Sequence, residues 1–196
     1  MTTATTETPT AALMMSEDSL GSSTSLGSRQ LLVLLTIGFL FLVPTMIAQT
    51  SSKSGAAPRL TYGMPITIEN AKRVAALAIA EGEKNGWDAA VAIVDIGGNL
   101  VYFEKRNDTQ VGSADVAIAK ARSAVLFKRP TRIFQDQVAS GGAGLRILGL
   151  AGAVPLDGGV PLVVRGQIVG AIGVSGDTSE HDGLCAKAGA DVLQQQ

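Results

Sequence analysis

The sequence predicts an α+β fold in which helices pack on an antiparallel sheet. The first observation is the order of predicted elements after residue 60, which runs helix, two strands, two helices, two or three strands and a last helix. This grouping, without strict strand–helix alternation, is typical of α+β domains. The second is glycine at the expected turns, at Gly97-Gly98 and at Gly166, which favours hairpins between neighbouring strands. A chain of 196 residues is long enough for one such domain with a proper core.

The first predicted helix spans residues 67–84, with Thr67 as its N-terminal cap and Asn85-Gly86 as its end. Residues 87–95 and 99–106 are predicted strands of one hairpin. A second helix is predicted over residues 112–127 from its spacing of apolar residues.

The second half begins with Arg129-Pro130, which ends that helix. Thr131 is expected to cap a short helix through residue 138, and residues 145–150 are interpreted as a strand. Two antiparallel strands then turn at Arg165-Gly166, and the last helix spans residues 179–193 behind a cap at residues 177–179.

Composition excludes several classes of function. The net charge of −1 and the aromatic content of 4%, with a pI of about 5.8, offer neither the basic field nor the stacking platforms of a nucleic-acid-binding protein. The chain has one cysteine, Cys185, and one histidine, His181. It therefore lacks the cysteines of a disulfide or a Cys-rich zinc site and the histidines of a metal cluster.

The N-terminal residues differ in composition from the rest. Residues 1–30 are rich in Thr, Ser and Ala without periodicity, which predicts disorder. Residues 31–48 form an uncharged apolar run close to the roughly 20 residues that span a bilayer, which predicts a signal peptide or a membrane anchor. Residues 49–59 are then a linker and residues 60–196 the folded domain. We expect the protein to be exported to the periplasm or the extracellular space, or anchored by residues 31–48, its only contact with the membrane.

Three stretches of the folded part carry a resemblance to a known family: "AVAIVDIGGNLVYFEKRND", "AIAKARSAVLFKRPT" and "GGVPLVVRGQIVGAIGVSGD" followed by "HDGLCAKAGAD". They resemble the GlcG/HbpS-like family of haem-binding and haem-degrading proteins, over residues 60–192. The resemblance implies a profilin-like fold with a five-stranded antiparallel sheet, a homo-oligomer, haem as the cofactor and, in some members, secretion. Members also include domains attached to corrinoid adenosyltransferases and glycolate-operon proteins.

The glycines near the last two strands leave two interpretations open. Gly170 and Gly173 remove side chains from a buried strand, and Gly158, Gly159 and Gly176 lie at strand ends where backbone N–H groups can point outward. They either form a pocket for a flat or anionic ligand or permit tight packing of helix on sheet or of subunits.

The basic residues also carry alternatives. Arg122 either pairs with Asp115 on the same helix or binds a ligand carboxylate such as a haem propionate. Lys120 is expected on the opposite face, in solvent or at a subunit contact. The group of Lys128, Arg129 and Arg132 around Pro130 is either a solvated helix end or a site for an anion. Arg122, Arg129 and Arg132 are the candidate ligand-binding cations.

His181 is the natural axial ligand for haem iron, although its place near a helix N-terminus is typical of an exposed cap. Asp182 is expected to hold the last helix against the glycine-rich loops through backbone N–H groups. Cys185 is expected to be buried as a small hydrophobe. Because strong axial ligands are scarce, haem would be held mainly by apolar contact and propionate salt bridges.

Three functions remain compatible with the sequence. The first is an exported module that binds haem or a related tetrapyrrole, as a haem buffer or an accessory of a sensor. The second is a cofactor-free enzyme acting on a small carboxylate or aldehyde. The third is a structural oligomerisation domain. The exported leader and the sparse catalytic chemistry favour the first.

Overall fold

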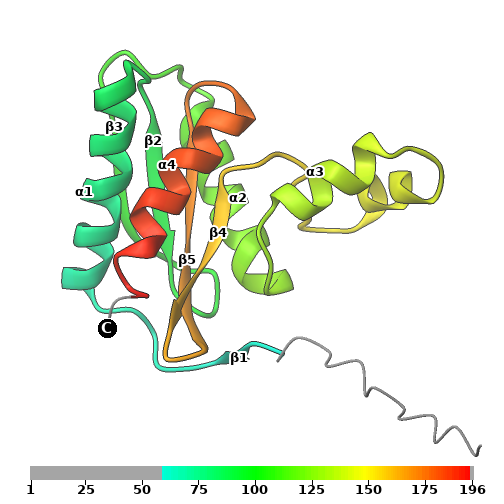
Figure 1. Cartoon of the computed structure of the whole chain (residues 1–196), viewed down its shortest axis with the longest axis horizontal. Coiled ribbons are helices and arrows are strands. Elements are labelled where there is room, and N and C mark those ends of the chain that lie inside the picture. Colours follow the sequence, from blue (N-terminus) through cyan, green and yellow to red (C-terminus); the bar gives the residue numbers. More distant parts are fainter. Residues whose placement is uncertain (1–58, 195–196) are drawn as a thin grey trace, which may run out of the picture. The chain divides into compact units, whose positions relative to one another are not determined.

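The computed structural model describes residues 59–194, so the predictions for residues 1–30, for residues 31–48 and for nearly all of the linker lie outside the described residues. The helices are α1 (Ile68–Asn85), α2 (Ser113–Phe127), α3 (Arg132–Ala139), the 3-10 helix η1 (Gly142–Gly149) and α4 (Ser179–Asp191). The strands are β1 (Thr61–Tyr62), β2 (Ala90–Val94), β3 (Leu100–Lys105), β4 (Gly159–Val164) and β5 (Gln167–Ser175). The predicted helices around α1, α2, α3 and α4 are confirmed, as are both hairpins (Figure 1).

The sheet has five strands, as predicted, but it is mixed. Strand β5 lies at its centre, with β4 antiparallel on one side and β2 antiparallel on the other, and β3 continues beyond β2. The prediction of a fully antiparallel sheet is wrong at β1, which pairs with the start of β5 in parallel. A strand of two residues is too short for the alternating pattern that predicts strands from sequence. That the fold is profilin-like stays a prediction.

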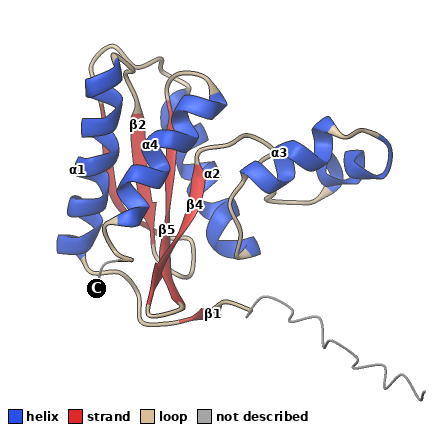
Figure 2. Ribbon diagram, viewed as in Figure 1, coloured by secondary structure: helices blue, strands red, loops and turns tan. Residues whose placement is uncertain are grey.

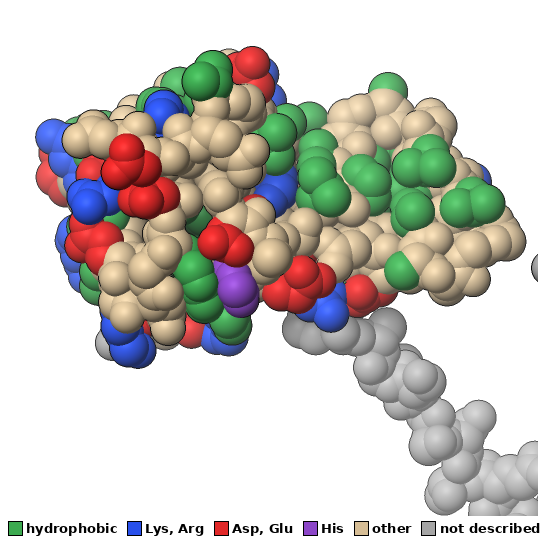
Figure 3. Space-filling view, turned by 90° about the horizontal axis from the view of Figure 1, so that it is seen from above, with side chains coloured by type: hydrophobic (Ala, Val, Ile, Leu, Met, Phe, Trp, Pro, Cys, Tyr) green, Lys and Arg blue, Asp and Glu red, His purple; other side chains and the backbone are tan. Residues whose placement is uncertain are grey.

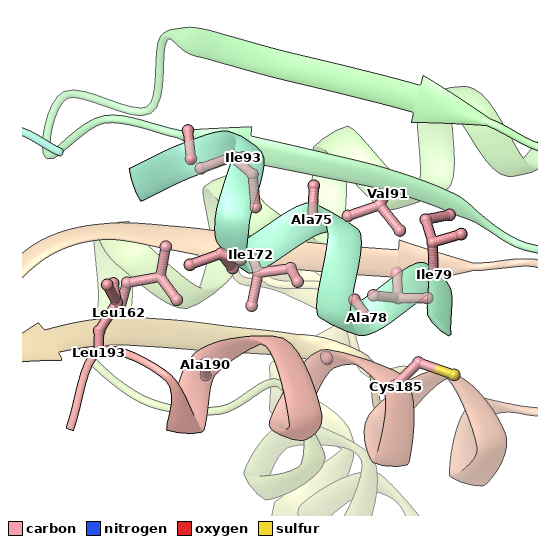
Figure 4. Close-up of a cluster of buried hydrophobic side chains, with 14 of the residues drawn as sticks. Ala75, Ala78, Ile79, Val91, Ile93, Leu162, Ile172, Cys185, Ala190 and Leu193 are labelled. Atoms are coloured by element: carbon pink, nitrogen blue, oxygen red, sulfur yellow. The ribbon is translucent and has the colours of Figure 1, made fainter. Parts of the chain in front are cut away.

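The elements form three layers. Helices α1 and α4 cover one face of the sheet and α2 covers the other (Figure 2). The main core lies between the sheet and the α1–α4 pair, where Val91, Ile93 and Ile172 meet Ala75 and Ala78 of α1 (Figure 4). Successive side chains of a strand point to opposite faces, so the remaining positions of β2 and β5 face α2.

The α2 face is built from very small side chains. Ala90, Ala92 and Ala117 form one cluster there. A Cβ atom at Gly173 would lie 2.0 Å from the backbone oxygen of Ala117. Of the two interpretations of this glycine, the structure therefore shows the tight packing of helix on sheet. Gly170 is likewise packed, because its Cβ would lie 2.3 Å from the backbone oxygen of Val94.

Helix α3, η1 and the segment that follows extend to one side of the sheet (Figure 1). We call residues 132–156 the apolar arm, because its exposed side chains include Ile133, Leu145, Leu148, Leu150 and Leu156. The strand predicted over residues 145–150 is wrong, since η1 occupies this position. A short apolar run does not by itself distinguish strand from helix. Two successive glycines with positive φ, Gly141 and Gly142, turn the chain directly into η1.

The helix ends follow the sequence in part. The Thr67 hydroxyl accepts a hydrogen bond from the Asn70 N–H at the start of α1, and Gly86 ends that helix in the left-handed conformation. Thr178 caps α4 in the same way. Thr131 makes no capping bond at α3, contrary to prediction, because its hydroxyl is used elsewhere. In the part of the chain that the structure describes, no helix has the length and apolar character needed to cross a membrane.

Cys185 lies in α4 facing the main core and is 1% exposed, which confirms the predicted burial (Figure 4). Burial, with a smaller contribution from the Asp182 carboxylate, raises the pKa of the Cys185 thiol to about 11. Because the thiolate is the reactive form, we expect no alkylation of native protein by iodoacetamide at pH 8 over an hour and complete alkylation after unfolding in urea. Mass spectrometry measures both. Rapid modification of the folded protein would contradict this.

Candidate functional site

A groove with a volume of about 500 Å³ lies on the outer side of α2. Its walls come from α2, from the first residue of β3 and from the end of the apolar arm. The lining is mostly apolar, with two charged residues, and consists of Leu100, Asp115, Ile118, Ala119, Arg122, Leu126, Gly152, Ala153 and Val154. These residues are far apart in the sequence, and only Arg122 was a candidate ligand-binding residue from sequence.

Arg122 is held in the groove by the turn between β2 and β3. Its Nε donates a hydrogen bond of 2.9 Å to the carbonyl of Gly98. Asp95 fixes that turn by accepting hydrogen bonds from the backbone N–H groups of Gly97 and Asn99, at 2.8 and 2.9 Å. Burial opposes ionisation of Asp95, but the bonds from Asn99 and the turn outweigh it and lower the pKa. The guanidinium is thus anchored at one edge.

The terminal nitrogens of Arg122 take part in none of the hydrogen bonds or ion pairs found among residues 59–194. The ion pair with Asp115, one of the two sequence interpretations, is therefore wrong within the described residues. The carbonyl of Gly98 holds the guanidinium instead. The terminal N–H groups of the guanidinium, which have no partner among residues 59–194, are suited to a carboxylate.

A second polar cluster is buried on the other side of α2. The Nζ of Lys120 lies 2.7 Å from a carboxylate oxygen of Asp182 and 3.0 Å from the carbonyl oxygen of Val174. The prediction that Lys120 lies in solvent is wrong, because the residue is 1% exposed. Burial raises the pKa of Asp182, and the Lys120 ammonium opposes that shift. Asp182 also accepts a bond from the Asp177 N–H, as predicted for its role in fixing α4.

Gly158 and Gly159 pack against this buried pair. A Cβ atom at Gly158 would lie 3.0 Å from Nζ of Lys120, and one at Gly159 would lie 2.5 Å from the backbone oxygen of the same lysine. The N–H of Gly159 donates to the Thr131 hydroxyl at 2.9 Å, which is the bond that replaces the expected helix cap. Gly176 lies beside Asp182, whose carboxylate its backbone N–H helps to stabilise, and its Cβ position is 2.0 Å from the backbone oxygen of Asp88. The ligand-binding roles predicted for these glycines stay predictions.

The basic group around Pro130 is divided in the structure. Arg132 binds Asp136 at 2.9 Å and Asp157 at 3.4 Å, and the other oxygen of Asp157 accepts from the Gly158 N–H at 2.7 Å. Arg132, Gly158, Gly159 and Asp182 thus lie in one continuous cluster. Arg129 stands apart, with its guanidinium over the Phe134 ring at 5.7 Å. Lys128 lies over the Tyr62 ring at 4.2 Å.

His181 belongs to the α1–α4 layer, on the opposite face of the sheet from the groove. Its ring stacks on Trp87 with centroids 3.9 Å apart, and its Nδ1 lies 2.9 Å from Asp177. The backbone bond from Thr178 and the contact with His181 lower the pKa of Asp177. The described residues hold no group of three or more His, Cys, Asp or Glu side chains that could bind a metal ion. The lining of the groove contains no His, Cys, Met or Tyr.

Sequence reasoning missed the burial of Lys120, although a signal was present. Ala117, Ala121 and Ala124 lie three before, one after and four after Lys120, and all are buried. Helical spacing places positions 117, 120, 121 and 124 on one face, so the pattern itself indicates that Lys120 faces the sheet. The groove walls at Leu100 and at residues 152–154 carry no such signal.

The chain thus belongs to the α+β class, with a mixed five-stranded sheet and an apolar groove on α2. The model of the family described as "Haem degrading protein HbpS-like" matches residues 66–191. The chain therefore belongs to the HbpS-like family, which confirms the resemblance to GlcG and HbpS.

Curated relatives support this membership. The chain is 38% identical over 110 residues to Protein GlcG of Escherichia coli K12, covering 56% of this chain and 81% of that protein. It is 31% identical over 132 residues to an uncharacterised 15.0 kDa protein from the dhaT-dhaS intergenic region of Citrobacter freundii, covering 66% of this chain and 93% of that protein.

Solved structures share the fold. A variant of HbpS from Streptomyces reticuli is 32% identical, with a TM-score of 0.61 over 70% of this chain and 97% of that one. Protein ORFY of Klebsiella pneumoniae is 27% identical, with a TM-score of 0.62 over 72% and 99%. A PduOC–heme complex is 23% identical, with a TM-score of 0.60 over 67% and 96%, and shows the fold alone.

Proposed function

We propose that this chain is a haem- or tetrapyrrole-binding module that holds its ligand in the groove on α2. The observation that carries the proposal is Arg122, a guanidinium anchored at the Gly98 carbonyl with its terminal nitrogens directed to no described partner, at the edge of an apolar groove of about 500 Å³. Apolar walls suit the face of a macrocycle, and a free guanidinium suits a carboxylate. Membership of the HbpS-like family supports the same ligand.

The residues present fit the organic part of haem better than its iron. Leu100, Ile118 and Leu126 offer apolar contact, and Arg122 offers a charge-assisted bond to a propionate. Among residues 59–194, the lining of the groove includes no His, Cys, Met or Tyr that could serve as an axial ligand. Haem would supply redox and oxygen chemistry at its iron when bound, whereas this chain binds and orients the macrocycle. We therefore propose a role in holding haem, as a buffer or as an accessory of a sensor.

A hemin titration of the full chain, followed at the Soret band, tests this proposal. We expect Arg122→Ala to weaken binding roughly tenfold or more, because a hydrogen bond to a charged group contributes about 1.5–3 kcal/mol. Ala119→Trp, which fills the groove, is expected to abolish the Soret shift. His181→Ala and the matched control Arg73→Ala, on α1, are expected to leave the titration unchanged.

Two outcomes would overturn the proposal. Loss of binding in His181→Ala with normal binding in Arg122→Ala would move the ligand to the α1–α4 face. No Soret shift in the unsubstituted chain would remove tetrapyrroles altogether and favour an enzyme acting on a small carboxylate or aldehyde.

We further propose that the protein is exported and forms a homo-oligomer. Export rests on the uncharged run at residues 31–48. The exposed leucines of the apolar arm support association, because soluble monomers rarely expose contiguous apolar patches of this kind. Cell fractionation with N-terminal sequencing tests the first proposal. A full-length chain that starts at Met1 and is found in the cytoplasm would contradict it.

A further inference from the structure

We infer that the groove on α2 is completed by a second copy of this chain, whose apolar arm covers the open side. The inference rests on the proposed function, since it adds the missing wall of the same site. A planar macrocycle has two faces, and a groove that is open to solvent can cover only one of them. A second apolar surface is therefore required, and the described part of the chain supplies one that its own groove does not use.

That surface is the apolar arm. Leu145, Leu148 and Leu150 are 49%, 66% and 41% exposed, and Ile133 of α3 adds to them. Figure 3 shows hydrophobic side chains gathered over this side of the molecule. These leucines lie within or just after η1, and their apolar side chains are suited to pack on the groove residues Ile118 and Leu126.

The arm and the groove adjoin each other in the fold. Residues 152–154 line the groove and follow η1 after two residues, so the C-terminal end of the arm forms one edge of the groove. In Figure 1 the arm extends away from the sheet rather than back over α2. A two-fold axis beside this shared edge would place each arm over the groove of the other copy. Such an isologous contact is the commonest form of oligomer.

Charge complementarity between Asp115 and Arg146 supports a second copy as the occupant. Asp115 lines the groove, and Arg146 lies between the exposed leucines of the arm. Neither side chain takes part in an ion pair within residues 59–194, and Arg146 donates only to the carbonyl of Ala143. When the arm of one copy lies in the groove of the other, Arg146 comes close to Asp115. Opposite charges at an interface favour this pairing and fix its register.

A charge exchange in the full chain tests the inference. Asp115→Arg and Arg146→Asp are each expected to weaken self-association roughly tenfold or more, because a close interfacial pair becomes a repulsion. The double variant carries the pair in reverse and is expected to restore association to near the original level. Light scattering across micromolar concentrations without hemin measures the assembly. Asp108→Arg and Lys72→Asp are the matched controls, and thermal unfolding checks that each variant folds.

Hemin dissociation provides the second measurement. We expect Arg146→Asp to release hemin roughly tenfold faster than the unsubstituted chain, with the double variant returning to the original rate. A monomeric unsubstituted chain, or single variants that associate normally, would overturn the inference. A double variant as weak as the singles would also overturn it. If the double variant regains self-association in light scattering while neither it nor the unsubstituted chain binds hemin, the interface is supported and the proposed function fails.

Discussion

Lys120→Ala is expected to destabilise the fold by about 3–5 kcal/mol, because it removes one partner of a buried ion pair. The substitution removes the ammonium that lies 2.7 Å from Asp182 and leaves a carboxylate in a site that is almost free of solvent. It also leaves the Val174 carbonyl without one of its donors. Urea unfolding followed by circular dichroism measures the loss as a lower midpoint at an unchanged slope.

Two companion variants separate the buried charge from a general loss of packing. Lys120→Met with Asp182→Leu removes both charges and is expected to recover most of the stability, since apolar replacement of a buried pair is often close to neutral. Lys187→Ala removes the exposed pair with Asp191 and is expected to cost less than about 1 kcal/mol. A Lys120→Ala protein within 1 kcal/mol of the original would show that Asp182 is neutral or hydrated in the fold.

Gly173→Ala is expected to cost about 3 kcal/mol and to abolish hemin binding. The added methyl group would meet the backbone of α2 at Ala117 and Ala121, at 2.0 and 2.6 Å. Backbone atoms cannot rotate out of the way as a side-chain end can, so the whole helix must move off the sheet. Because α2 carries Ile118 and Arg122, the groove moves with it.

Gly149→Ala is the matched control, because no atom lies within 4 Å of the position that its Cβ would take. It is expected to change stability by less than about 0.5 kcal/mol. Thermal unfolding and a hemin titration on the same samples test both variants. A Gly173→Ala protein that keeps its stability and its Soret shift would show that α2 does not pack on β5 as closely as described.

The sequence predicted most of the fold because its local signals agree with the tertiary structure. Apolar spacing located α1 and α2, and the turn at Arg165-Gly166 was evident from the glycine, with both residues at positive φ. The exceptions are elements whose secondary structure depends on contacts with distant parts of the chain. Strand β1 exists only through its contact with β5, and η1 has an apolar run that a strand could equally contain.

The candidate site was predicted less completely. Arg122 could be singled out because it flanks an apolar stripe, but the pair with Asp115 is displaced by the carbonyl of Gly98, a residue far away in the sequence. Lys120 was misplaced because charged residues are seldom fully buried, a tendency that here outweighed the helical spacing. Which distant segments close a groove depends on tertiary packing and has no local signature.

The position of β5 at the centre of the sheet affects how the protein is made. This strand pairs with β1, β2 and β4, yet about 100 residues separate its first residue from β1. A ribosome adding roughly 5–20 residues per second needs on the order of 5–20 s to cover that distance. Within this interval α1 and the β2–β3 hairpin are complete once Lys105 is made, and the strand that joins them is then absent for a further roughly 3–12 s. The nascent chain must therefore keep two apolar faces from aggregating, and we expect its yield in cells to depend on chaperones that bind it before Gln167 emerges.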